Sequence, residues 1–401
     1  LELYLARGYD KRPKETTFMI HRGIATFGLD TGKCPRWLFE RMVALARPII
    51  WVIVEEYGPD EFIQRIGDPV WFQSLGIVLA FDWNASGLTT ILTAALKEAI
   101  RGQEKELGIF ICGGKGKTSR KTPDEIMHWG EVLSLPAPKV DNLVYNSRMA
   151  AKVDSALVQD GFQIYHHAFF FCRSGAWSVV QQGMNQANQT ARRYHWYSER
   201  ITDLVCQPHS GIISQIKTPT LDLTAKESQH TRQVSTELAR GSYAGLMKDI
   251  QILSRHFCHT SQMISLKRNN EKLTLLNLTD YDFRWHPVVE ENFFESPYLK
   301  RILAKVCAIK PHNYEQLLSL EGVGPKTMRA LSLVSEVIYA AKPSYQDPAR
   351  YSFAFGGKDH IPYPVERRIY DAAIEFFRRI IPKAKLSYLE KNKMLVKLNQ
   401  L

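Results

Sequence analysis

A glycine pair followed by a lysine is the stretch whose residue types best suit the binding of an anion. Gly322 and Gly324 are one residue apart, and Pro325, Lys326 and Thr327 follow them directly. A short turn of this kind before a helix leaves backbone N–H groups unpaired and directed outward, where they suit a phosphate. We therefore expect Gly322, Gly324, Lys326 and Thr327 to contact DNA. The alternative is a plain corner between two core helices.

The flanking residues predict the two helices that must position this turn. Residues 314–320 are short and amphipathic, and Asn313 suits their N-cap. Pro325 suits the first turn of the second helix, because its missing N–H is not needed there. Thr327, Met328, Leu331 and Val334 then recur at helical spacing.

The positive charge of the chain is concentrated in the segment that carries the glycine turn. The net charge is +11, and residues 296–401 hold 18 Lys and Arg against 9 Asp and Glu. A basic segment beside a phosphate-binding turn favours a polyanion as partner. A solvated terminal helix with Lys391, Lys393 and Lys397 is the alternative explanation.

A second basic loop follows an apolar run that is typical of a buried strand. Residues 107–112 predict the strand, and residues 113–123 form a Gly- and Lys-rich loop. The glycines are too close together for a Walker A loop. Thr122 and Pro123 predict a helix start, which could bind a second anion. The expected DNA contacts are Lys115, Lys117, Arg120 and Lys121, unless the loop is only a mobile basic surface.

Residues 162–184 predict a β-hairpin whose strands cover 164–171 and 177–182. His166 and His167 must then face opposite sides of the sheet. Arg192 and Arg193 follow, next to aromatic residues, in a pattern that suits phosphates and unstacked bases or the edge of a core. We include both arginines among the expected DNA contacts. His209 lies in a loop and is either catalytic or part of a turn.

Composition excludes several classes of protein. The sequence contains no run of 18 apolar residues, so we expect no membrane partner. Six scattered cysteines without a Cys-x-x-Cys pair argue against a zinc site and against a disulfide framework. We expect reduced thiols and a cytoplasmic protein, with no metal or cofactor.

The predicted fold is α+β, with a large mixed N-terminal domain followed by a mainly helical domain. The expected divisions are an extension over residues 1–20, the α+β domain over 21–215, a helical connector over 216–295 and a basic domain over 296–401.

Four blocks in order resemble one uncharacterised prokaryotic family, catalogued as domain of unknown function 763. The blocks are residues 21–23, 33–42, 113–123 and 181–196. The resemblance covers most of the chain and implies no activity.

Residues 296–385 resemble the helix-hairpin-helix DNA glycosylases and lyases. In that family a lysine after Gly-Val-Gly-Pro attacks the sugar C1′, and a downstream Asp in a Pro-Val-Asp run assists departure of the base. The resemblance assigns these roles to Lys326 and Glu366, with Lys358, Arg367 and Arg368 as further DNA contacts. The carboxylate here is Glu rather than Asp, and the segment between the two motifs is longer than usual.

The chemistry implied by this resemblance makes further demands on the site. A nucleophilic lysine must be neutral, which requires desolvation or neighbouring cations. The carboxylate would stabilise an oxocarbenium-like transition state. A flipped base needs a wedge and a stacking partner. Candidates for these two roles are the aromatic residues Tyr345, Tyr351, Phe353, Phe355 and Tyr363.

Three functions follow from these observations. The first is a DNA-binding protein of DNA repair or processing that excises bases through Lys326 and Glu366. The second is a nuclease in the N-terminal domain that uses a divalent metal with carboxylates such as Asp82, Asp154 and Asp160. The third is a non-enzymatic protein that binds DNA or RNA.

Overall fold

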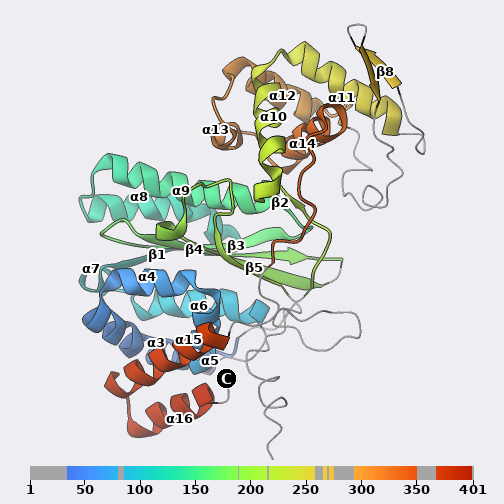
Figure 1. The fold of residues 1–401 in the computed structure, drawn as a ribbon. Coiled ribbons are helices and arrows are strands. Elements are labelled where there is room, and N and C mark those ends of the chain that lie inside the picture. Colours follow the sequence, from blue (N-terminus) through green and yellow to red (C-terminus); the bar gives the residue numbers. More distant parts are fainter. Residues whose placement is uncertain are drawn as a thin grey trace, which may run out of the picture.

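The computed structural model describes residues 34–79, 85–187, 189–214, 216–257, 265–268, 271–274, 293–349 and 367–399. The fold is α+β, as predicted, and consists of an antiparallel sheet between two helical layers with a helical bundle above (Figure 1). The block at residues 21–23 lies outside the described residues.

The central sheet has five antiparallel strands in the order β1-β3-β4-β5-β6. The predicted strand after residue 107 and the predicted β-hairpin are both present, as β1 and as β3 with β4. The bounds are β1 Ile109–Lys115, β3 Gln163–Cys172, β4 Trp177–Asn185, β5 Thr190–Tyr197 and β6 His209–Ser214. A separate two-stranded pair joins β2 (Val158–Gln159) to β7 (Leu221–Asp222).

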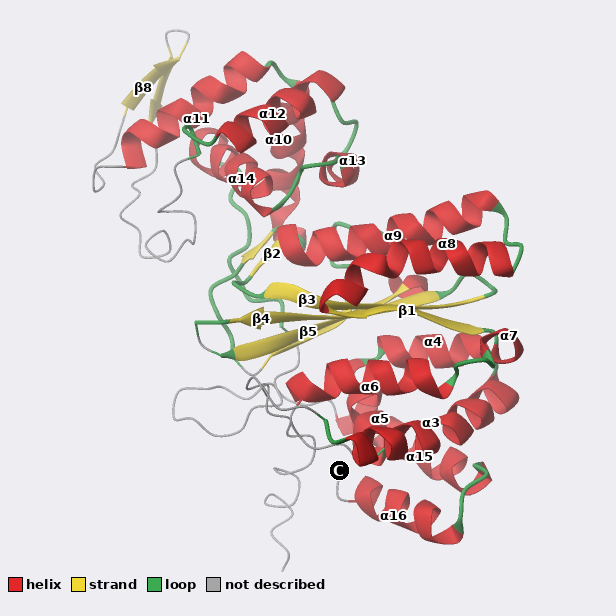
Figure 2. Ribbon diagram, turned by 180° about the vertical axis from the view of Figure 1, so that it is seen from behind, coloured by secondary structure: helices red, strands yellow, loops and turns green. Residues whose placement is uncertain are grey.

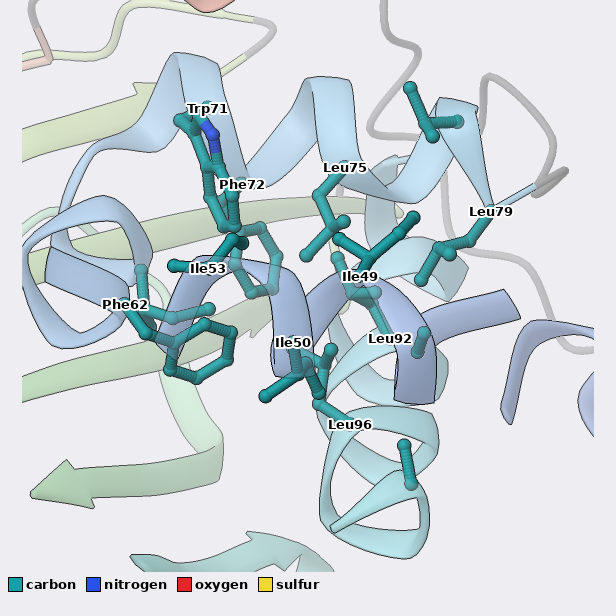
Figure 3. Packing of buried hydrophobic residues seen from close by; sticks show 14 of the residues in the cluster. Ile49, Ile50, Ile53, Phe62, Trp71, Phe72, Leu75, Leu79, Leu92 and Leu96 are labelled. Atoms are coloured by element: carbon teal, nitrogen blue, oxygen red, sulfur yellow. The ribbon is translucent and has the colours of Figure 1, made fainter. Parts of the chain in front are cut away.

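One face of the sheet is covered by helices from both ends of the described chain (Figure 2). Trp71 is fully buried there and stacks on Phe377 with 5.3 Å between ring centroids. Figure 3 shows Trp71 and Phe72 beside the isoleucines and leucines of this core. The helices are α3 Arg36–Tyr57, α4 Pro59–Gly67, α5 Pro69–Val78, α6 Ala85–Ala99, α15 Arg367–Ile380 and α16 Tyr388–Asn399, and the short α7 Glu104–Leu107 leads into β1.

The opposite face carries α8 (Thr122–Val132) and α9 (Ala137–Ala156), and a helical bundle packs beyond α9 (Figure 2). The proline at the start of α8 is in its first turn, as the sequence predicted. Apolar side chains of α8, α9, the sheet and the bundle form one continuous core. The bundle comprises α10 Gln229–Arg240, α11 Tyr243–Phe257, α12 Pro297–Ile309, α13 Tyr314–Ser319 and α14 Pro325–Tyr339, and β8 Ser265–Arg268 pairs with β9 Glu271–Thr274.

Contacts between helices cross the expected domain boundaries. The helices α12 and α14 pack on α10 and α11, which come from the expected connector, whereas α15 and α16 pack on α5. The segment that enters the bundle and the segment that leaves it lie side by side. They are joined by a hydrogen bond from the Asp222 N–H to the Ser344 carbonyl at 2.9 Å. The boundaries themselves stay a prediction. Among the described residues, none of the helices combines the length and the apolar character needed to cross a bilayer.

Candidate functional site

The glycine turn lies between α13 and α14, in the arrangement that the sequence predicted. The Asn313 side chain accepts a hydrogen bond from the Gln316 N–H at 2.7 Å, which confirms the expected N-cap. Pro325 is the first residue of α14, and Gly324 is its N-cap. Helix, turn and helix start are therefore all present.

The two glycines serve different purposes. Gly322 has a φ of +87°, and a Cβ there would lie 2.4 Å from Cδ1 of Ile302, so both backbone conformation and space require glycine. Gly324 has an extended backbone, and nothing lies within 4 Å of a Cβ built on it. Val323 between them is buried. The turn is thus anchored at Gly322 and Val323, and it is open at Gly324.

A lysine from the layer below holds the first helix of the motif. The Lys152 ammonium on α9 donates to the carbonyl oxygens of Leu318, Ser319 and Leu320 at 2.8, 3.1 and 2.7 Å. These carbonyls belong to the last two residues of α13 and to the residue after it. Carbonyls at the end of a helix have no partner within the helix. Burial lowers the pKa of Lys152, and its three bonds fix the end of α13 to α9.

The surface around the turn combines cations with an exposed aromatic ring. The Tyr298 hydroxyl donates to the Gly322 carbonyl at 2.6 Å, and the Arg301 guanidinium lies 5.7 Å from the centre of its ring. Tyr298 is 46% exposed. Lys326 is half-buried in the first turn of α14, and Lys305 pairs with Glu321 at 3.2 Å. We call the surface of Tyr298, Arg301, Lys305, Gly324 and Lys326 the hairpin face.

Thr327 departs from its expected role as a DNA contact. Its side chain is fully buried beneath α14. Only its backbone N–H, in the first turn of the helix, remains suited to an anion. Thr327 therefore belongs to the packing of α14 and is not part of the hairpin face.

The second basic loop exposes its cations, but the backbone N–H at its start is not available to a phosphate. Lys115, Lys117, Arg120 and Lys121 are all exposed. The Gly113 N–H instead donates to Oε2 of Glu125 at 2.8 Å, and the same oxygen accepts from Lys97 at 2.6 Å. Glu125 thus occupies the position that a phosphate would take. A cleft of about 420 Å³ beside it is lined by Lys97, Lys115 and Thr118 among others.

Arg192 and Arg193 lie inside the protein, with no exposed surface. Arg192 pairs with Asp160 at 2.9 Å and with Asp347 at 2.7 Å on one side of the sheet. Arg193 donates to Gln73 at 3.0 Å on the other side. We therefore correct the expectation that they contact DNA, because their guanidinium groups serve buried partners.

Among the predicted DNA contacts that follow residue 350, Arg367 and Arg368 belong to the described residues, and their helix lies away from Lys326. Glu366, Lys358, Tyr351, Phe353, Phe355, Tyr363 and Asp82 lie outside the described residues. Arg367 and Arg368 begin α15, which packs on α5 and α3 across the sheet from the hairpin. The Tyr345 hydroxyl donates to Glu336, so this ring is held by a carboxylate of the bundle.

His166 and His167 face opposite sides of the sheet, as predicted. His166 contacts Thr93 of α6 at 3.2 Å, and His167 contacts Ser147 of α9 at 2.9 Å. Both are buried, and burial lowers the pKa of His166 to about 3 and that of His167 to about 4. Both rings are therefore neutral near pH 7.

Of the three carboxylates considered for a nuclease, Asp154 and Asp160 are described, and the side chains of both are fully buried and have protein partners. Asp160 accepts from Arg192 and from the Tyr194 hydroxyl at 2.6 Å. Asp154 pairs with His209 at 2.5 Å. Within the part of the chain that the structure describes, no cluster of three or more His, Cys, Asp or Glu is arranged to hold a metal ion.

The pairing of Asp154 with His209 was not predicted, although each residue was considered separately. The two side chains come from α9 and the start of β6, 55 positions apart. Neither sequence motif nor spacing connects them, so only the fold brings them together.

Comparison with known proteins assigns the chain to a family but gives no activity. No curated protein and no solved structure shows significant similarity to it. A family model described as "Protein of unknown function (DUF763)" matches residues 23–365. This range includes the basic loop, the sheet, the bundle and the hairpin face. The chain therefore belongs to the DUF763 family.

Proposed function

We propose that this protein binds DNA through the hairpin face and acts in DNA repair or processing. The observation that carries the proposal is the open space at Gly324, at the N-terminus of a 15-residue helix. A helix N-terminus with unpaired N–H groups attracts phosphate oxygens. An open glycine allows the phosphate to approach the backbone closely.

The side chains of the hairpin face support the same partner. Lys326 and Arg301 supply positive charge beside the turn, and the exposed Tyr298 supplies a ring. Contacts of this kind go to the phosphates and the sugars, so they give affinity that depends on salt but little sequence preference. Glu321, whose side chain is 95% exposed, is held by Lys305.

The exposed lysines and arginine of the second basic loop support a further contact. No Asp or Glu lies between these four cations in the sequence. Glu125 in the first turn of α8, which contacts the start of the loop, is already paired with Lys97. In this proposal the loop adds non-specific attraction, and the hairpin face fixes the register of the backbone.

Binding is tested by fluorescence anisotropy with a labelled duplex over a series of salt concentrations. Lys326→Ala should weaken binding and reduce the salt slope by about 1. Gly324→Ala adds one methyl group in open space and should leave the melting temperature unchanged, yet weaken binding about tenfold. Lys393→Ala on α16 removes the same charge from the opposite side of the sheet and is the matched control.

Equal affinity of the three variants and the wild type would exclude the hairpin face as the binding surface. A loss of binding that is equal in Lys393→Ala and Lys326→Ala would indicate attraction by net charge alone. A labelled single-stranded RNA in the same series separates RNA binding from DNA binding.

Base excision through Lys326 and Glu366 is the enzymatic form of the proposal. It is tested by borohydride trapping in EDTA on duplexes with uracil, hypoxanthine, an oxidised base or an abasic site. A covalent adduct that disappears in Lys326→Ala supports an imine intermediate. Tight binding without adduct or base release excludes this chemistry. The same panel with magnesium or manganese tests the nuclease.

A further inference from the structure

A buried aspartate and a histidine with a largely buried side chain form a hydrogen-bonded pair between α9 and β6, outside the hairpin face. The Asp154 carboxylate is fully buried, and the His209 side chain is 7% exposed. His209 Nε2 lies 2.5 Å from Oδ1 of Asp154. The Trp196 indole N–H donates to Oδ2 at 3.1 Å, and the Gln181 amide donates as well. Asp154 is therefore fixed as an acceptor.

This arrangement determines the tautomer of the histidine. An ionised Asp154 can only accept hydrogen bonds, so its bond to His209 then places the proton on Nε2. The neutral ring then carries a lone pair on Nδ1. Among the described residues, Nδ1 of His209 has no hydrogen-bond partner, and the ring lines a cavity of about 210 Å³. The Trp196 ring holds it edge-on at 4.9 Å between centroids.

A second titratable group lines the same cavity. Oδ1 of Asp222 accepts from the N–H and the hydroxyl of Thr224 at 2.9 and 2.6 Å. Burial raises the pKa of Asp222, and the hydrogen bonds from Thr224 act against this rise. The cavity thus combines a base on a buried carboxylate with a carboxyl group that holds its proton more tightly than usual.

The charge of the cavity restricts the class of reaction. Asp347 and Glu227 are also part of the lining, and among the described residues that line the cavity there is no lysine or arginine. Arg192 is shared between Asp347 and Asp160, so a single guanidinium serves two carboxyl groups. Negative surroundings disfavour phosphates and the oxyanions of acyl transfer, and they stabilise a transition state that gains positive charge. Cleavage of a glycosidic bond has such a transition state.

We propose that the cavity around His209 is a second site, which hydrolyses the glycosidic bond of a small glycoside without phosphate, such as a nucleoside. The volume is below the range of cavities for drug-sized ligands, which suits a single sugar unit. This proposal does not rest on DNA binding at the hairpin face.

The bond changes follow from the two groups. His209 Nδ1 takes a proton from water, and the water oxygen forms a bond to the anomeric carbon. The bond from that carbon to the leaving atom breaks, its electron pair stays on the leaving atom, and Asp222 supplies the proton there. Asp154 stabilises the imidazolium. Solvent then returns a proton to Asp222 and removes one from His209, so the net reaction consumes one water.

The test is hydrolysis of p-nitrophenyl glycosides and of free nucleosides by the full-length protein, followed by absorbance and by chromatographic detection of the released base. His209→Gln should lower kcat at least about 100-fold, with KM little changed. Asp222→Asn should lower kcat to a similar degree. His230→Gln, an exposed histidine on α10, is the matched control and should retain full activity.

Asp154→Asn tests the role of Asp154 in positioning His209. Comparison of its melting temperature with that of the wild type shows whether the variant still folds. It should lower kcat and leave glycoside binding intact. The proposal is overturned if no member of the panel is hydrolysed, or if His209→Gln retains the wild-type rate. The panel contains no DNA, so its hydrolysis does not depend on binding at the hairpin face, and failure of one proposal is distinguishable from failure of the other.

Discussion

Replacement of Lys152 by methionine should lower the local stability of the hairpin without removing a residue of the hairpin face. The variant keeps the length of the side chain and removes three bonds from its ammonium to the end of α13. A hydrogen bond from a charged donor contributes about 1.5–3 kcal/mol. The desolvation that lowers the pKa of Lys152 offsets part of this sum, and water can reach the freed carbonyls because the side chain is only half-buried. We therefore expect a net loss of about 2 kcal/mol in the local opening free energy, or a factor of about 30.

Hydrogen–deuterium exchange measures this loss directly. Peptides that cover residues 314–328 should exchange about 30-fold faster in Lys152→Met, while peptides from β3 and β4 keep their wild-type rates. Lys139→Met is the control, because Lys139 caps the turn at Arg173 and Ser174 with two bonds and does not contact the hairpin. Unchanged exchange in residues 314–328, or faster exchange throughout the protein, would refute this account of how α13 is held.

Two further predictions concern the groups buried in and against the sheet. Asp160→Asn leaves Arg192 without one of its buried partners, so the free energy of unfolding in urea should fall by about 3 kcal/mol, whereas Glu40→Gln in an exposed pair should change it by less than about 1 kcal/mol; equal effects would contradict the role given to burial. His166 and His167 have folded-state pKa values of about 3 and about 4, below the unfolded value of about 6.5. Their contribution is fully present above about pH 6.5 and is lost as the pH falls towards 4, because only the unfolded chain takes up the protons. Urea unfolding over this pH range should show that His167→Gln flattens the decline, and an unchanged slope would contradict it.

Local patterns in the sequence predicted most of the elements that form the hairpin. Asn313 and Pro325 mark helix starts through their own side chains, and Gly322 marks the turn through its backbone, so no distant residue is needed to recognise them. The opposite orientations of His166 and His167 followed from the alternation of a strand in the same way.

The interior ion pairs could not be predicted from the same kind of pattern. Arg192 and Arg193 stand directly before a run of aromatic residues, and this pattern is the same for a nucleic-acid surface and for a central strand with buried charges. What distinguishes the two is the carboxylate partner, and Asp347 is 155 positions away from Arg192. The pairing of Asp154 with His209 could not be predicted for the same reason, because it depends on the register of β6 and on the position of α9 in the fold.

The C-terminal helices also illustrate the limits of local pattern. Residues 367–399 share their positive charge with the hairpin segment, so sequence reasoning grouped them in one domain. In the structure, the burial of Phe376 and Phe377 against Trp71 determines where α15 lies. A charge pattern describes the solvent side of a helix and says nothing about which core its apolar side joins.

The stacking of Phe377 on Trp71 has a consequence for the order in which the protein is made. Every residue of α5 is buried, and α15 and α16 supply part of its cover. These helices are translated almost 300 residues after α5. At roughly 5–20 residues per second, the ribosome needs about 15–60 s for that distance. During this time part of the apolar surface of α5 has no cover, because α15 and α16 do not yet exist. Until they emerge, the newly made protein stays unaggregated only if aggregation is slow or a chaperone covers this surface.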